Sequence, residues 1–473
     1  MNPLTISSSE FRRLSERVTT VAAQYLDDFD KQTIAPAVTG EESRRLFDAP
    51  VPEQGIGLDV LKDLTDIVNC SRAQNGRFFG YVLGSGEPVA AVADLMASVL
   101  NQNVTAWRSS PAAVMMEKTA VRWLAEAIGC PGFHGHLTGG GSSANLMGMA
   151  MAREAGAPAN ETGNGGKGIV YAADQIHMSI PKSIALLGIG RNHMHLIPTD
   201  SSLRMIPDEL DRRIVQDKAA GKTPLAVVAS AGTVSTGAID AFRPIAEIAR
   251  RHGAWFHIDG AYGALAAIAD PTRFGGMELA DSISLDPHKW LYQPLDCGCL
   301  LYRSPEAARR AFSHTGEYAR SLSNDPIEGF AFFEESVELS RRFRALKLWF
   351  SLRYHGLASF RESIRKDLAH ARRLADAVSN ESRLELLAPV ELSAVCFRYK
   401  AKNSDEERNR FNAALLKRIL KRGRIYLSNA SLQGKFSLRA CVVNHRTRDS
   451  DIDSVVPEVL EAARELEPAL SHP

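Results

Sequence analysis

The chain has 473 residues, of which 45% are hydrophobic and 23% are charged. At about 150 residues per domain, this length predicts about three domains, and the composition excludes disordered, collagen-like and coiled-coil chains. Lys and Arg total 56 against 55 Asp and Glu, so the net charge of +1 creates no long-range field that would attract nucleic acid or an anionic membrane.

Two further features predict a cytoplasmic protein. No run approaches the ~18 consecutive apolar residues of a membrane helix, and residues 1–14 lack the apolar core of a secretory signal. The six cysteines are spread thinly over the chain, which is typical of reduced thiols rather than of a disulfide framework. We therefore expect no membrane partner, and we interpret Cys297 and Cys299 as small core residues.

The order of patterns along the chain predicts three parts. Residues 1–75 form a helical segment, in which Ser7 and Glu10 have capping-box spacing and apolar residues recur at steps of three and four from Phe11 to Phe29. This stripe needs a cover, either from the same chain or from a second subunit. Residues 76–350 alternate β-type and helical runs, which predicts a large α/β domain with a mainly parallel sheet, and residues 351–473 predict a small α+β domain.

Five predicted strands of the large domain end in polar or glycine-rich sequence. In a parallel α/β sheet the ligand binds beyond the carboxyl ends of the strands, so we expect these five ends to meet in one crevice. The segments are residues 138–145 (TGGGSSAN), 174–177 (DQIH), 232–233 (GT), 259–263 (DGAYG) and 286–290 (DPHKW).

The glycine run predicts a phosphate-binding turn, because small residues let an anion approach the free amides at a helix start. A tight turn without a ligand is the structural alternative. Gly139, Gly141 and Ala144 also fit the dinucleotide pattern of a nicotinamide-dependent oxidoreductase. That pattern expects an acidic residue ~20 positions further on, and Asp174 comes too late.

Lys289 and Asp259 are the strongest chemical signals. A lysine directly after a buried strand suits a core only if its amine is neutralised or covalently bonded, and such lysines form Schiff bases. Pyridoxal phosphate requires a lysine, a carboxylate for its ring nitrogen and a phosphate cradle, and all three are present. The alternatives are a surface lysine, a turn-forming aspartate, His177 as a helix cap, and a metal site at His257 and Asp259, for which no third ligand is evident.

Residues 284–290 (SLDPHKW) resemble the signature of the group II pyridoxal-phosphate-dependent decarboxylases, which include aromatic-L-amino-acid, histidine and glutamate decarboxylases. The resemblance is strongest to bacterial aromatic-amino-acid decarboxylases. It implies an α/β fold of the pyridoxal-phosphate-dependent fold type I (aspartate aminotransferase-like) and a homodimer whose N-terminal segments are exchanged. Similar sequence extends through residues 103–111, 138–145, 232–240, 257–263, 286–298 and 341–347.

The resemblance also implies roles for individual residues. Lys289 would bind the cofactor covalently, Asp259 would contact its ring nitrogen, and His177 would stack on the ring and face the substrate carboxylate. The other implied cofactor-binding residues are Gly141, Ser142, Thr233, Ala261, Asp286 and His288.

Residues 312–330 have the composition of a mobile active-site loop. The resemblance places the proton-donating tyrosine of the family at Tyr318. Related aldehyde synthases have phenylalanine there, so Tyr318 predicts an amine product rather than an aldehyde.

The resemblance assigns the substrate pocket to Tyr81, Asn103, Thr105 and Ser340. Tyr81 matches an aromatic pocket position, Asn103 and Thr105 replace apolar residues, and Ser340 resembles plant enzymes that favour phenolic side chains. We expect decarboxylation of an aromatic L-amino acid such as tyrosine, DOPA, tryptophan or phenylalanine. Decarboxylation of glutamate, aspartate or histidine, an aldehyde synthase, an oxidoreductase and a non-catalytic dimeric scaffold remain alternatives.

Overall fold

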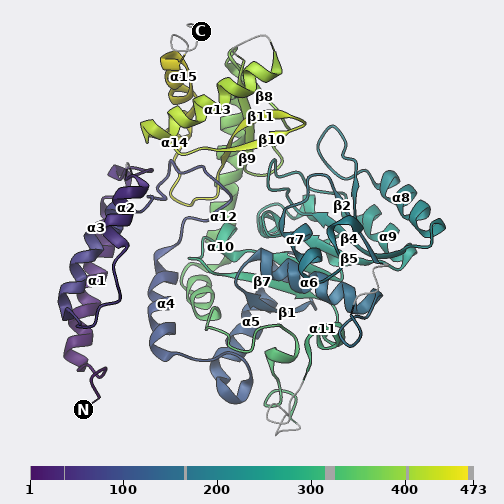
Figure 1. Ribbon diagram of the computed structural model, residues 1–473, viewed down its shortest axis with the longest axis horizontal. Coiled ribbons are helices and arrows are strands. Elements are labelled where there is room, and N and C mark those ends of the chain that lie inside the picture. The colour runs from purple at the N-terminus through teal and green to yellow at the C-terminus, as the bar shows by residue number, and fades with distance from the viewer. Residues whose placement is uncertain (1, 37, 164–167, 315–324, 401–403, 467–473) are drawn as a thin grey trace.

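The computed structural model describes residues 2–36, 38–163, 168–314, 325–400 and 404–466. At its centre is a seven-stranded sheet with the order β1-β7-β6-β5-β4-β2-β3 (Figure 1). The five strands β6, β5, β4, β2 and β3, which are neighbours in this order, pair in parallel. β7 is antiparallel to both β6 and β1. The predicted mainly parallel sheet is therefore confirmed. Its strands are β1 (His134–Thr138), β2 (Gly168–Ala173), β3 (Met194–Ile197), β4 (Thr223–Ser230), β5 (Trp255–Asp259), β6 (Ser282–Leu285) and β7 (Gly298–Tyr302).

Helices cover both faces of this sheet, which explains why the central strands are apolar almost throughout. On β4, Val227 and Ala229 pack toward α8 and α9, while Ala226 and Val228 pack toward α6 and α7. The helices of this part are α4 (Pro88–Leu100), α5 (Pro111–Ala127), α6 (Gly141–Gly156), α7 (Ser179–Leu186), α8 (Pro207–Ala219), α9 (Phe242–His252), α10 (Pro287–Trp290) and α11 (Pro305–Phe312).

A second, antiparallel sheet forms the C-terminal part in the order β10-β11-β9-β8, which confirms the predicted small α+β unit. The long helix α12 (Ala345–Asn380) leads into it and leaves helical geometry at Gly356, where φ is 75°. The boundary predicted at residue 350 falls inside α12 and stays a prediction. The other elements are α13 (Asp405–Arg422), α14 (Asp449–Asp453), α15 (Val455–Leu466), β8 (Leu384–Leu386), β9 (Ala394–Tyr399), β10 (Ser428–Leu432) and β11 (Lys435–Cys441).

The N-terminal segment contains α1 (Ser8–Asp27), α2 (Gly40–Phe47) and α3 (Asp63–Cys70), which stand at one edge of the molecule, apart from the large sheet (Figure 1). α1 begins as predicted, because the Glu10 amide donates to Ser7 Oγ at 3.1 Å. No residue of α1 is buried, and Phe11 and Val18 are 44% and 45% exposed. The described part of one chain therefore leaves the apolar stripe of α1 only partly covered, since Leu14, Val21 and Tyr25 are half-buried.

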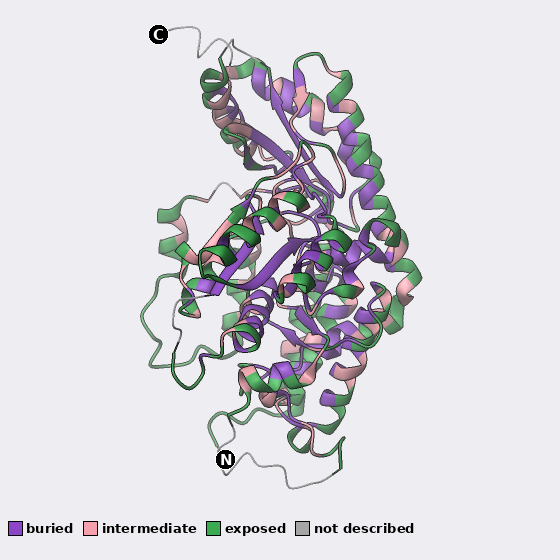
Figure 2. Cartoon of the chain, turned by 90° about the vertical axis from the view of Figure 1, so that its right-hand side faces the viewer, coloured by how far each residue is buried: buried purple, intermediate pink, exposed green. Residues whose placement is uncertain are grey.

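Buried residues concentrate in the two sheets and in the helix faces that pack against them, whereas the outer helix faces are exposed (Figure 2). None of the described helices is long and apolar enough to cross a membrane.

Candidate active site

A cavity of about 330 Å³ lies where the five predicted strand ends meet. Each of the five segments contributes to its wall, so the expected convergence is confirmed. The contributing residues are Gly139, Gly140, Gly141, Ser142, Asn145, His177, Gly232, Asp259, Ala261, Tyr262, Asp286, His288 and Lys289.

Lys289 lies in the cavity wall one helical turn after Asp286, and its Nζ is 2.8 Å from Asp286 Oδ2. This geometry follows from the sequence, because Pro287 starts the short helix α10 directly after Asp286. The Lys289 side chain is only 17% exposed, so the ion pair is largely shielded from water. Asp286 thus holds the amine at the cavity.

His288 supports the same carboxylate from the other side. The Cys297 amide donates to His288 Nδ1 at 3.2 Å, which leaves the ring proton on Nε2. Nε2 lies 3.5 Å from Asp286 Oδ2. Burial lowers the pKa of His288, so the ring is neutral at neutral pH.

The glycine run forms the turn from β1 into α6 and borders the cavity. Gly140 has φ +133°, a conformation that side chains rarely allow, and a Cβ on Gly141 would lie 2.5 Å from the Cβ of Ala261. Asp286 Oδ1, which is buried next to this turn, has no hydrogen-bond partner. The close approach and the amides at the start of α6 form a site that suits a flat, anionic ligand.

Asp259 ends β5 and is 7% exposed. Its Oδ1 accepts hydrogen bonds from Ser284 Oγ at 3.2 Å and from the Ala261 amide at 3.3 Å. These bonds fix the carboxylate in the cavity wall.

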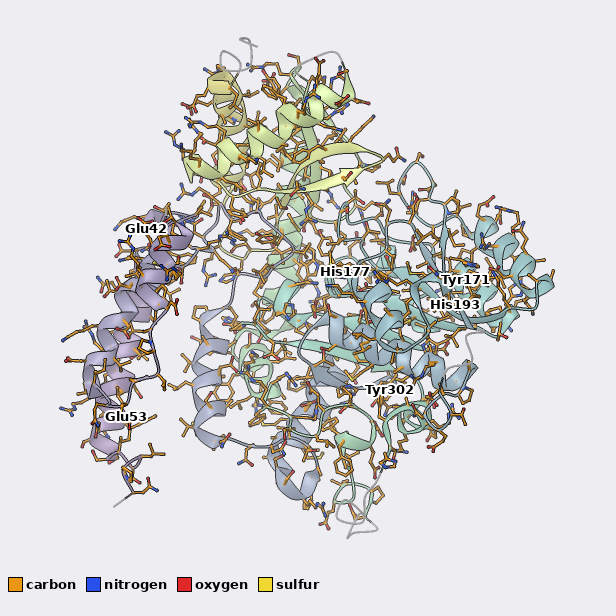
Figure 3. All side chains as sticks on the ribbon, in the orientation of Figure 1. Glu42, Glu53, Tyr171, His177, His193 and Tyr302 are labelled. Carbon is orange, nitrogen blue, oxygen red and sulfur yellow. The ribbon has the colours of Figure 1, made fainter. Side chains whose placement is uncertain are left out.

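His177 lies between β2 and α7, near the middle of the molecule (Figure 3). Burial lowers its pKa, Asp259 raises it and Lys289 lowers it, with a net decrease. Ser179 contacts Nδ1 through both its hydroxyl, at 2.9 Å, and its amide, at 3.3 Å. A neutral imidazole therefore faces the cavity.

Thr233 lies beside the cavity but does not line it. Its hydroxyl contacts Thr236 Oγ1 at 3.0 Å, and its amide donates to the Ala238 carbonyl. Its neighbours Gly232 and Val234 are the wall residues of this loop. Cofactor binding by Thr233 stays a prediction.

The four predicted substrate residues do not line the cavity of the same chain. Tyr81 is 46% exposed, and its hydroxyl is 2.9 Å from that of Tyr426. Asn103 Oδ1 accepts from the Arg341 amide, next to Ser340, and the Thr105 carbonyl accepts from the Phe332 amide. Their substrate roles stay predictions.

Tyr318 lies outside the described residues, so its predicted role as proton donor also stays a prediction.

Two wall residues, Asn145 and Leu295, were not among the predicted site residues. Asn145 carries a usable signal, because it belongs to the segment 138–145 that was expected at the crevice. Leu295 carries none, since its place depends on how the segment after α10 folds back.

His257 is not available as a ligand for the metal site considered at His257 and Asp259. Both ring nitrogens of His257 are hydrogen-bonded, Nδ1 with Ser282 Oγ at 2.8 Å and Nε2 with Asn145 Oδ1 at 2.9 Å. Within the described ranges, no group of three His, Cys, Asp or Glu side chains could hold a metal ion. Cys297 is a buried thiol, and burial raises its pKa to about 12.

The cavity residues fit pyridoxal phosphate. They provide the Lys289 amine, the Asp259 carboxylate, small walls at Gly141 and Ala261, and the amides at the start of α6 for the phosphate. Together with the mainly parallel sheet, this donor set defines a pyridoxal-phosphate-dependent enzyme of fold type I.

Comparisons with known proteins give the family. The pyridoxal-dependent decarboxylase conserved domain matches residues 40–400. The chain is 32% identical to the aromatic-L-amino-acid decarboxylase of Bacillus atrophaeus, covering 99% of this chain and 98% of the relative. It is also 32% identical to the phenylacetaldehyde synthase of Petunia hybrida, covering 92% of this chain and 91% of the relative.

A solved structure agrees with these sequence matches. The tryptophan decarboxylase of Catharanthus roseus in complex with L-tryptophan superposes with a TM-score of 0.90 at 29% identity, covering 98% of this chain and all 100% of the other. The chain belongs to the pyridoxal-dependent decarboxylase family. It is an amino acid decarboxylase with pyridoxal phosphate as its cofactor, which overturns the nicotinamide interpretation of Gly139, Gly141 and Ala144.

Proposed function

We propose that the protein removes the carboxylate of a bulky aromatic L-amino acid and releases the corresponding amine and CO₂. The observation that carries the proposal is the convergence of Lys289, Asp259 and His177 on one cavity beside the start of α6. The named activities of relatives that match nearly the whole chain support the aromatic substrate.

Bound pyridoxal phosphate supplies an electron-poor ring that accepts the electrons of the breaking bond. Lys289 would bind it, and the first amides of α6 would hold its phosphate. Asp259, fixed by Ser284 and Ala261, would keep a proton on the ring nitrogen. These contacts set the orientation that selects which substrate bond breaks.

The substrate side needs two more groups. His177 would present its Nε2–H to the substrate carboxylate. Tyr318 would deliver the proton that replaces CO₂ on Cα, so that substrate plus one proton gives amine and CO₂. Both roles are part of the proposal.

The proposal includes a cytoplasmic homodimer with exchanged N-terminal segments. The exposed part of the α1 stripe supports it, as do the apolar residues on the exposed face of α4, where Val92 and Val99 are 65% and 53% exposed. Asn103 and Thr105 follow α4 directly, so a second subunit that covers α4 would also approach these candidate substrate residues. All six cysteines are free thiols, which supports a reducing compartment.

A panel of L-amino acids tests the substrate class. The protein loaded with pyridoxal phosphate is given tyrosine, DOPA, tryptophan, phenylalanine, glutamate, aspartate and histidine, and both CO₂ and amine are measured. We expect the highest kcat/KM with an aromatic substrate and no turnover by the Lys289→Ala variant. A higher kcat/KM with glutamate, aspartate or histidine contradicts the proposal, and release of aldehyde in place of amine identifies an aldehyde synthase.

A further inference from the structure

A buried hydrogen-bond network begins at the large sheet, behind the cavity. Trp255 Nε1 donates to Ser282 Oγ at 2.8 Å, and Ser282 Oγ lies 2.8 Å from His257 Nδ1. An indole N–H can only donate, and the Ser282 hydroxyl has no other hydrogen-bond partner among the described residues, so its own hydrogen finds an acceptor only at His257 Nδ1. His257 therefore carries its proton on Nε2. Burial lowers its pKa to about 4, which keeps the ring neutral.

The direction of donation continues from His257 to His177. His257 Nε2 donates to Asn145 Oδ1 at 2.9 Å, which fixes the orientation of the amide, and Asn145 Nδ2 donates to Ser179 Oγ at 2.8 Å. The Ser179 hydroxyl, having accepted this bond, donates to His177 Nδ1 at 2.9 Å. The Ser179 amide donates to the same nitrogen. His177 Nδ1 is therefore an acceptor, and the ring proton belongs on Nε2.

We propose that the buried network of Trp255, Ser282, His257, Asn145 and Ser179 is a positioning device that holds His177 as the Nε2–H tautomer and fixes its ring at the cavity wall. The opposite tautomer would set an Nδ1–H against two donors of Ser179. Reversing the network would not relieve this clash, because the Ser179 amide can only donate to Nδ1. It would also leave the buried Ser282 hydroxyl accepting from both Trp255 and His257, with no acceptor for its own hydrogen among its described contacts. What His177 does to the substrate rests on the proposed function, whereas its tautomer does not.

The polar side chains in the middle of this network are almost completely buried. His257 and Ser282 are 0% exposed, Asn145 1% and Ser179 4%. Apolar side chains could fill the same space between α6 and the sheet without requiring any hydrogen bond. α6 also lies directly on the imidazole, since a Cβ on Gly148 would approach His257 Cε1 to 2.7 Å. The network thus joins β5 and β6, α6 and α7, and it ends at His177, which faces the cavity.

Nitrogen-15 NMR of histidine-labelled protein tests the tautomer directly, with and without pyridoxal phosphate. The His177 signals are assigned among the 13 histidines by their loss in the His177→Gln variant. We expect an unprotonated Nδ1 and a protonated Nε2 already in the cofactor-free protein. A dominant Nδ1–H form, or an even mixture of tautomers, overturns the proposal even if every variant below fails to fold.

Two variants interrupt the network at different points, and a matched control leaves it intact. Ser179→Ala removes the hydroxyl donor. In Asn145→Asp the new carboxylate accepts from both neighbours, which turns the Ser179 hydroxyl away from His177 and adds a negative charge. The control is Ser183→Ala, one turn later in α7, because the Ser183 hydroxyl is also buried and bonds only the Ser179 carbonyl.

We expect the Nδ1–H tautomer of His177 to become measurable in Ser179→Ala but not in Ser183→Ala. In Asn145→Asp the added charge should raise the pKa of His177 by roughly one unit, and the acid limb of the kcat profile should move with it. If both network variants match the control in tautomer and pKa, the network does not position His177. Absence of amine from every aromatic substrate would contradict the proposed function and leave the NMR result standing.

Discussion

The cavity and the N-terminal segment differ in how far a single chain completes them. In the cavity, Lys289 and Asp259 have polar partners in the same chain, Asp286 and Ser284. In α1 no residue is buried, and Phe11 and Val18 of the apolar stripe are exposed. The residues proposed for the cofactor therefore gather within one chain, whereas the residues proposed for the substrate lie outside this cavity.

The Asp259→Asn variant tests the residues proposed to bind the cofactor. It has the largest expected effect. The amide oxygen can still accept from Ser284 and Ala261, so the geometry is kept while the charge beside the cofactor ring is lost. We expect kcat to fall roughly 10²- to 10³-fold, the range for removing an electrostatic group from a reaction centre. The rate is measured as CO₂ release at saturating pyridoxal phosphate.

Ser284→Ala is the matched control, because it removes one hydrogen bond to Asp259, together with the bond from the Gly260 amide to Ser284 Oγ, and leaves the carboxylate. We expect a clearly smaller loss than in Asp259→Asn. Equal losses in the two variants would show that the orientation of Asp259, and not its charge, is what the reaction needs.

Tyr318→Phe tests the substrate half. We expect the variant to release mainly aldehyde, because Cα is no longer protonated and O₂ becomes the co-reactant. Substrate, O₂ and water then give aldehyde, CO₂, ammonia and hydrogen peroxide. Product analysis with a peroxide assay follows the change, and a variant that still releases only amine removes Tyr318 from the mechanism.

The cavity residues also show which parts of the site the sequence predicts well. The positions of Lys289, Asp259 and the glycine run were predictable because each lies at or shortly after the end of a strand, and the ends of parallel strands share one edge of the sheet. The partners of His257 were not, since Asn145 lies 112 positions away in the chain and only packing brings the two together. The boundary predicted at residue 350 coincides with no break in the structure, because α12 continues across it.

Charges on the α1 stripe test the proposed dimer. Burying two apolar side chains of this size contributes at least about 3 kcal/mol, so Phe11→Asp combined with Val18→Asp should raise the dimer Kd by roughly 100-fold or more. Sedimentation measures the mass, and activity should fall with the dimer fraction. The control is Arg13→Asp with Thr20→Asp, which lie on the opposite face of α1. Two monomeric proteins, or two unchanged dimers, would show that the stripe has another role.

The smallest expected effect concerns pH and the buried network. Burial lowers the pKa of His257 to about 4, from an ordinary value near 6.5. The folded state thus binds this proton less readily than the unfolded state does. The contribution of His257 to stability is fully present above about pH 6.5 and is lost as the pH falls toward 4. Between pH 7.5 and pH 5 the loss is about 2 kcal/mol.

Urea unfolding at both pH values measures this loss, and His257→Gln should remove it although the variant is less stable at neutral pH. The matched control is His314→Gln, because His314 is exposed on the surface and should leave the acid-dependent loss unchanged. If His257→Gln keeps the full loss, His257 is protonated in the folded protein at pH 5. The ring could then no longer accept from Ser282, and the direction of donation that reaches His177 would not hold at that pH. If the network is intact, part of the stability that the wild-type protein loses between pH 7.5 and pH 5 must come from His257.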